Sequence, residues 1–247
     1  SFIYDNPGRL NERLFVSLLI LNFFTKNFFR HLLSFCCVIS IVLTFRFNAI
    51  CSLLLFPVLG LFIGSTRNSF LKIIPLTITA LLGGENQIRS YFVDGQTPRQ
   101  LLFQGGMEVA RRFFPLGSGF STFGSDQAAK HYSELYYELG YNNMWGMQPN
   151  NELFLNDTFW PMLVAQFGFI GAVLYLLFLI TQVQFMLNLR IHKRSKQIVL
   201  MVFFYTIISS IGSAILTGAE GMTLWMFIAI CINSSAFSNK LSKKDEA

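Results

Sequence analysis

The run TFWPMLVAQFGFIGAVLYLLFLITQVQFML, from Thr158 to Leu187, decides the fold class of this chain. It contains no Asp, Glu, Lys or Arg, and it exceeds the about 20 apolar residues that a helix needs to cross a bilayer core. We therefore predict a membrane-spanning helix here.

The composition of the whole chain agrees with a lipid environment. Of its 247 residues, 53% are hydrophobic and only 13% are charged, and the mean hydropathy is +0.48. An ordinary soluble domain carries roughly a quarter charged residues. The net charge of +6 is also found in nucleic-acid-binding proteins, but here Lys and Arg form short clusters between apolar runs. These clusters indicate membrane topology, so we expect no nucleic-acid partner.

Other apolar runs predict further spans on both sides of Thr158–Leu187. Together they predict an all-α fold, a polytopic membrane helix bundle of about six to seven spans with one large extracytoplasmic helical loop. The first and fourth runs are the weakest, because they contain polar residues or proline. The candidates are Leu14–Phe29, Leu32–Phe45, Ala49–Gly64, Phe70–Leu82, Thr158–Leu187, Ile198–Leu216 and Met222–Phe237.

The orientation of the bundle follows from the basic turn Arg190–Lys196. Cytoplasmic loops carry an excess of Lys and Arg, so this turn is expected in the cytoplasm and the long polar segment Gly84–Asp157 outside it. That segment is acidic overall, with eight Asp and Glu against five Lys and Arg. We predict four parts: residues 1–83 and 158–239 as membrane helices, 84–157 as the extracytoplasmic loop, and 240–247 as a cytoplasmic tail.

Two minor features complete this organisation. The polar end Ser238–Ala247 has the composition of a disordered segment. All four cysteines lie in apolar runs without metal-ligand spacing, which indicates buried thiols.

The outer segment contains one predicted amphipathic helix, Thr97–Phe113. Thr97 fits the N-cap, Pro98 fits the first helical position, and apolar residues recur along one face. We expect this helix to lie along the membrane surface. The loop Pro115–Gly124 follows, and its glycines allow either an anion-binding backbone or a plain structural turn.

An aromatic stretch with nearby carboxylates follows the glycine-rich loop. Aromatic faces beside carboxylates suit sugar rings, which offer apolar C–H faces and hydroxyl edges. An interfacial aromatic belt explains the same pattern. The candidate substrate-binding residues are His131, Tyr132, Tyr136, Trp145, Glu152 and Trp160.

Three charged residues are the candidates for chemistry. Arg46 lies between two apolar runs, where an arginine is costly unless it is paired or reaches the interface. Arg99 begins the amphipathic helix on the same predicted side, and two guanidinium groups suit a diphosphate. Asp157 directly precedes the predicted helix Thr158–Leu187, and it serves equally well as a helix cap or as a base.

These elements resemble the membrane superfamily of O-antigen polymerases and ligases, which build bacterial surface polysaccharides. Asp5–Leu10 is similar to the Asn-Pro-rich helix start of that family, Leu43–Arg46 to its first arginine element, and Pro98–Leu101 to its second. The ligases carry His-Asn, nine residues and Gly-x-x-Gly, and here Asp157 and Thr158 precede nine residues and Gly168–Gly171. Asp157 replaces the histidine of the ligases, which favours the repeat-unit polymerases of capsule, exopolysaccharide or lipopolysaccharide synthesis.

The resemblance implies an inverting, metal-independent membrane glycosyltransferase without a cofactor. It would polymerise polyprenyl-diphosphate-linked oligosaccharides, such as undecaprenyl diphosphate conjugates, at the outer face of the bacterial cytoplasmic (inner) membrane. It implies catalytic roles for Arg46, Arg99 and Asp157, with Glu152 and His131 as reserve bases. It also implies that the chain is the C-terminal part of a longer protein, and it is compatible with a chain-length regulator as a partner.

Two other functions fit parts of the pattern. A ligase would transfer finished glycan to an acceptor with similar residues. A flippase, a non-enzymatic transporter of the same lipid-linked unit, would place ionisable groups inside several helices and would not need the long outer segment. The last three predicted spans are almost free of charge in their middles, which disfavours the flippase.

Overall fold

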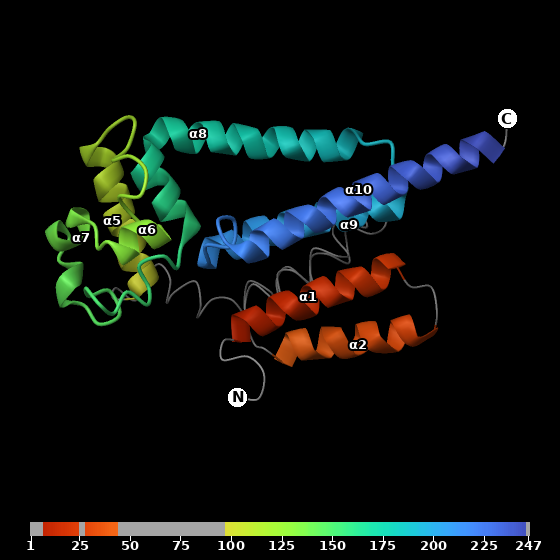
Figure 1. Ribbon diagram of the computed structural model, residues 1–247, viewed down its shortest axis with the longest axis horizontal. Helices are drawn as coiled ribbons and strands as arrows, with labels where there is room; N and C mark the ends of the chain where they lie inside the picture. Colours follow the sequence, from red (N-terminus) through yellow and green to blue (C-terminus); the bar gives the residue numbers. More distant parts are fainter. Residues whose placement is uncertain (1–6, 25–27, 44–96, 246–247) are drawn as a thin grey trace, which may run out of the picture. The chain divides into compact units, whose positions relative to one another are not determined.

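The computed structural model describes residues 7–24, 28–43 and 97–245 (Figure 1). These residues form helices and turns without a strand, and Gln148 and Asn151 make an isolated bridge. The all-α class is therefore confirmed for the described part of the chain. The chain divides into two compact units, one of residues 1–85, 186–208 and 223–247 and the other of residues 86–185 and 209–222.

The first unit contains α1 (Pro7–Phe24), α2 (Phe28–Leu43) and most of α9 (Lys193–Gly212) and α10 (Ala219–Asp245). Buried aromatic rings hold it together. The ring of Phe15 in α1 stacks on Tyr205 in α9 at 4.0 Å between centroids, and Phe203 packs against Trp225 in α10 at 5.7 Å.

The second unit shows that most of the predicted outer loop is a folded body. It contains α5 (Pro98–Arg112), α6 (Asp126–Lys130), α7 (Glu134–Glu138), the short 3-10 helix η1 (Tyr141–Asn143) and α8 (Phe159–Asn188) as far as Phe185. Its core combines side chains from all of these elements. The largest buried members are Leu102, Phe123, Tyr136, Tyr141, Met147 and Leu155.

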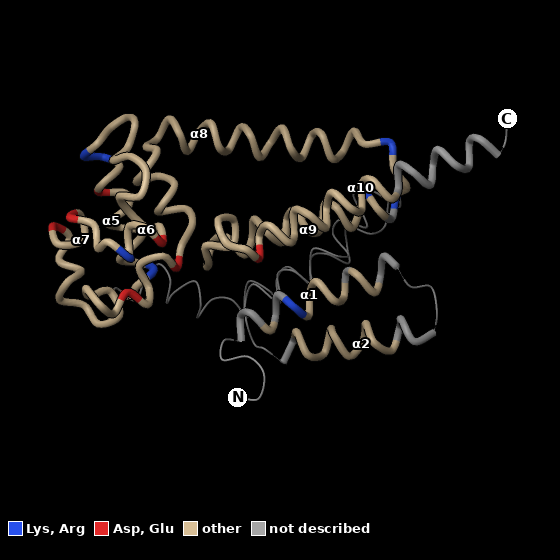
Figure 2. The backbone as a smooth tube through the Cα atoms, in the orientation of Figure 1, with Lys and Arg blue, Asp and Glu red and all other residues tan. Residues whose placement is uncertain are grey.

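The long helix α8 is broken at Gly168, where φ is 65° and ψ is −169°. Only glycine adopts this backbone conformation at low cost. Before the break most side chains are buried, whereas beyond it most are exposed and apolar. Figure 1 shows the resulting bend, and Figure 2 shows that α8 carries no Lys, Arg, Asp or Glu.

Two described helices are long and apolar enough to cross a membrane, α8 and the Ser195–Gly212 part of α9. In the most apolar window of α8 only 28% of the residues are buried, against 67% in α9. A core helix of a soluble protein is mostly buried, so α8 differs from one. The predicted spans Ala49–Gly64 and Phe70–Leu82 lie outside the described residues.

The boundaries of the other predicted spans differ from the observed helices. The predicted first span began at Leu14, but α1 begins at Pro7, because proline is favoured in the first helical turn. The predicted span Ile198–Leu216 ended too late, since α9 stops at Gly212 and a turn follows. In the C-terminal tail the expectation of disorder is wrong up to Asp245, where α10 ends.

Candidate functional site

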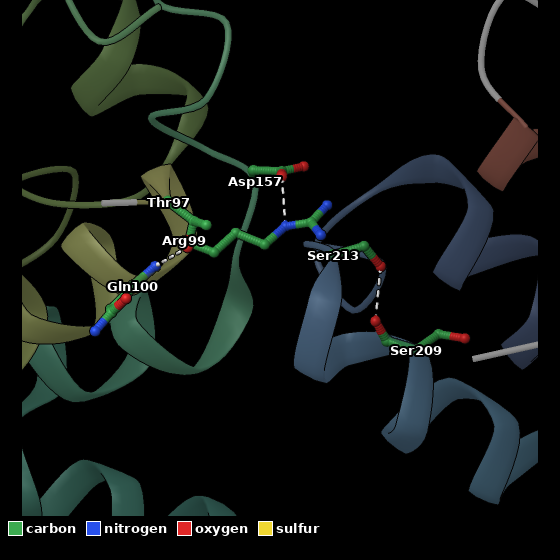
Figure 3. Close-up of polar contacts among 6 residues, drawn as sticks. All are labelled: Thr97, Arg99, Gln100, Asp157, Ser209 and Ser213. Carbon is green, nitrogen blue, oxygen red and sulfur yellow. Dashed lines mark hydrogen bonds and ion pairs between the residues drawn. The ribbon is translucent and has the colours of Figure 1, made fainter. Parts of the chain in front are cut away.

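Arg99 and Asp157 form an ion pair in the second unit. The Nε atom of Arg99 donates to Oδ2 of Asp157 at 2.7 Å, although the two residues are 58 positions apart (Figure 3). The side chains retain 28% and 34% of their accessible surface. Tertiary structure thus joins two of the three residues that were expected to carry chemistry.

The start of α5 fixes the backbone of Arg99. As predicted, Thr97 is the N-cap and Pro98 occupies the first helical turn. The Thr97 hydroxyl accepts a hydrogen bond from the backbone N–H of Gln100 at 3.4 Å, which satisfies one of the donors left open at a helix start (Figure 3). Arg99 therefore projects from a capped first turn, not from a loose loop.

Two adjacent glycines of α5 lie close to other elements of the second unit, Gly106 to the first turn of α8 and Gly105 to Tyr141 of η1. A Cβ atom on Gly106 would lie 2.9 Å from the backbone oxygen of Pro161, and one on Gly105 would lie 2.1 Å from the hydroxyl of Tyr141. At Gly106 the neighbouring atom belongs to the backbone, so a side chain there would force the two helices apart. The contact at Gly106 thus lies one turn into α8, the helix that Asp157 precedes.

Asp157 lies just outside the helix that it was expected to cap. Because α8 begins at Phe159, Thr158 occupies the position directly before it. Thr158 is 3% exposed, and its hydroxyl has no hydrogen-bond partner. A buried polar atom without a partner costs roughly 1–3 kcal/mol. The entrance to α8 therefore contains an unsatisfied hydroxyl beside the Arg99–Asp157 pair.

The glycine-rich loop Pro115–Gly124 is bound to the break in α8. The N–H groups of Ser118 and Gly119 donate to the backbone oxygens of Ala165 and Gln166 at 2.9 and 3.0 Å. These are the carbonyls that the break at Gly168 removes from the regular helical pattern. Of the two interpretations of this loop, the structural turn therefore agrees with the observed hydrogen bonds.

Gln166 is a structural residue that sequence reasoning missed. Its side-chain oxygen accepts from the N–H of Ser121 at 3.2 Å, its amide nitrogen donates to the backbone oxygen of Phe123, and the side chain is 4% exposed. The available signal was a single amide within the apolar stretch 159–180. Such a residue in a predicted span indicates a polar partner from elsewhere in the chain.

Tyr132 and Tyr136 are buried in the core of the second unit. The hydroxyl of Tyr132 donates to the backbone oxygen of Met147 at 2.9 Å, and that of Tyr136 accepts from the N–H of Gly124 at 2.8 Å. Burial raises the pKa of Tyr132 to about 12 and also raises the pKa of Tyr136. Their rings and hydroxyls contribute to the core of the second unit, and contact of these two tyrosines with a substrate stays a prediction.

Trp145 is the most exposed ring of the aromatic stretch. Its side chain is 72% exposed, and its ring packs beside Phe154 with 5.8 Å between centroids. Leu153, which directly precedes Phe154 in the sequence, is exposed as well. An exposed indole supported by a second ring offers a flat face for stacking.

The remaining predicted residues have separate environments. Glu152 is half-buried, and its carboxylate accepts from the backbone N–H of Asn150 at 2.7 Å. His131 is exposed at the end of α6. The indole N–H of Trp160 donates to the Ser210 hydroxyl at 3.0 Å, which ties the first turn of α8 to the end of α9 within the second unit. Arg46 lies outside the described residues.

Comparisons with known proteins returned no match. No family model, no curated protein and no solved structure matches this chain. The geometry of the described residues and their chemistry therefore carry the functional argument.

Proposed function

We propose that this chain polymerises polyprenyl-diphosphate-linked oligosaccharide repeat units at the outer face of the bacterial cytoplasmic membrane. The observation that carries the proposal is the Arg99–Asp157 pair at the entrance to α8. It joins a cationic group suited to diphosphate and a carboxylate suited to a sugar hydroxyl. In the proposed topology a bundle of about six to seven spans holds the segment up to Asp157 outside the membrane.

Contacts at both ends of α8 support this topology. At its start, Trp160 bonds Ser210 near the end of α9, and near its end the backbone oxygen of Leu187 accepts from Nζ of Lys196 at 2.7 Å. Two consecutive spans joined by the basic turn 190–196 begin and end on the same side of the membrane. That side is outside, since the basic turn is cytoplasmic.

The reaction is a displacement at the anomeric carbon of the donor sugar. The acceptor hydroxyl forms the new C–O bond, the bond to the lipid diphosphate breaks, and the configuration inverts. Asp157 accepts the proton of the attacking hydroxyl, and the polyprenyl diphosphate leaves with the bonding electron pair. Arg99 and Arg46 neutralise the charge that develops on the diphosphate.

The ion pair couples substrate binding to the base. A guanidinium that contacts Asp157 is attracted equally by the diphosphate of an arriving substrate. When the diphosphate takes over the guanidinium, the carboxylate exchanges this partner for the acceptor hydroxyl. The partly exposed side chains leave solvent access for this exchange.

The exposed ring of Trp145 is the proposed platform for the growing glycan. Stacking on an indole face leaves the sugar hydroxyls free for polar groups such as Glu152 and His131. The buried residues Tyr132 and Tyr136 have no direct role in this proposal. A chain-length regulator protein remains a proposed partner.

The test is an assay in proteoliposomes that contain the full chain and a single lipid-linked repeat unit. A ladder of products that differ by one repeat supports the polymerase. A single addition to a foreign lipid acceptor identifies a ligase instead, and the absence of any new glycosidic bond removes the enzymatic proposal. Transfer of the unit between leaflets without bond formation identifies a flippase.

A further inference from the structure

The segment that follows α5 exposes large apolar side chains. Phe114, Leu116 and Phe120 are 70%, 69% and 79% exposed, and Phe113 is exposed as well. Four large apolar side chains on so short a stretch are costly in water. This stretch, residues 113–120, is called the apolar loop below.

The apolar loop is bound to α8 at residues 165–168. Its backbone bonds to Ala165 and Gln166, and a Cβ atom on Gly168 would lie 2.1 Å from the backbone oxygen of Pro115. The ring of Phe120 packs edge-on against Phe167 at 4.7 Å, while that of Phe114 lies 6.0 Å from Phe169. The loop is therefore fixed beside the break of α8.

Beyond the break, α8 has the length and surface of a membrane span. The piece Phe169–Asn188 has about 20 residues and is about 30 Å long, the thickness of a bilayer core. Most of its exposed side chains are apolar, as at Ile170, Leu174 and Leu177. The piece before the break is mostly buried within the second unit.

Basic side chains precede the apolar loop directly. Arg111 and Arg112 end α5 and are both exposed. Arg112 is paired with Glu138. Arginine next to exposed aromatic residues is typical of segments that sit at the boundary between lipid headgroups and acyl chains.

We propose that the apolar loop inserts into the outer leaflet of the lipid bilayer, and that the span of α8 begins at Phe169. The lipid-facing surface of α8 and the apolar loop then form one continuous surface, with Arg111 at headgroup level. The nine residues of α8 before Gly168 belong to the extracytoplasmic body. This inference goes beyond the reaction proposed above and does not depend on it.

The test measures the depth of spin labels in liposomes that contain the full chain. Cys36, Cys37, Cys51 and Cys231 are first replaced by serine, and single cysteines are introduced by Leu116→Cys and Phe120→Cys. Tyr137→Cys, exposed on α7, is the water control, and Leu177→Cys is the lipid control. All four positions are exposed, so the labels displace little packing.

The expected result is that labels at Leu116 and Phe120 lose collisions with a water-soluble nickel chelate and gain collisions with oxygen, as at Leu177. Nickel collisions as frequent as at Tyr137 would overturn the proposal. Protection from both reagents would also overturn it, because the loop would then be covered by protein, such as a second copy of the chain.

Discussion

The ion pair of Arg99 and Asp157 is partly exposed, and exposed ion pairs contribute only about 0.2–1 kcal/mol to stability. Asp157→Asn is therefore expected to leave the unfolding free energy nearly unchanged. A positioned proton acceptor contributes roughly 100- to 10,000-fold in rate, so in the proposed reaction Asp157→Asn is expected to lose that factor. Formation of the product ladder in proteoliposomes, compared at equal amounts of folded protein, measures this loss.

A matched control is available in the same unit. Arg112 and Glu138 also form an exposed ion pair, but outside the proposed site. Glu138→Gln is expected to keep the full rate of ladder formation. If Asp157→Asn and Glu138→Gln gave the same rate, Asp157 would have no role in proton transfer.

Tyr132 makes the second unit sensitive to alkaline pH. Burial raises its pKa to about 12 from the ordinary value of 10, with smaller contributions from Tyr137 and Glu152. Up to pH 10 the phenol is protonated in both states, so its contribution to stability is complete. Between pH 10 and 12 the unfolded chain loses the proton first, and stability falls.

Tyr132→Phe is therefore expected to weaken the pH dependence between pH 10 and 12. The variant also loses the hydrogen bond to Met147, so it starts from a lower stability by about 0.5–1.5 kcal/mol. Unfolding of the full chain in detergent micelles, followed by near-ultraviolet circular dichroism at several pH values, gives both quantities. An unchanged pH slope in the variant would contradict the assigned pKa.

At the scale of elements, the break in α8 depends on Gly168. Gly168→Ala would place a Cβ atom 2.1 Å from the backbone oxygen of Pro115 and force alanine into a conformation that only glycine adopts readily. We expect a loss of at least about 2–3 kcal/mol in the stability of the second unit. Denaturant unfolding in micelles measures it.

Gly140→Ala provides the comparison. Gly140 also has a positive φ, of 73°, but no atom within 4 Å meets its Cβ position. Its replacement is expected to cost only about 1–2 kcal/mol. Equal losses of stability at both positions would mean that the close contact between Pro115 and Gly168 does not contribute to the cost of Gly168→Ala.

For the whole molecule, the proposed topology predicts which residues are reached from outside the cell. In the cysteine-free background, an impermeant thiol reagent should label Asn150→Cys in intact cells. It should label His192→Cys, in the basic turn after α8, only after permeabilisation; both side chains are exposed. The reverse labelling pattern would show that the chain has the opposite orientation in the membrane, so that Asp157 would not lie on the outer face.

The sequence by itself determined the helical class, the apolar run of α8 and the capped start of α5. These features depend on local composition, on spacing, and on the conformational preferences of threonine and proline near a helix start. It also singled out Arg99 and Asp157, although it did not show that they meet. The continuation of α10 to Asp245 escaped it, because polar composition alone did not indicate a helix there.

Only the tertiary structure decided how these parts combine. Arg99 pairs with Asp157, Gly106 lies against Pro161, and the loop around Pro115 lies against the break in α8. It also separated the buried Tyr132 and Tyr136 from the exposed Trp145, which sequence composition treats alike. Contacts between residues far apart in the chain determine these features, and the conformational preferences of short sequence segments do not specify such contacts.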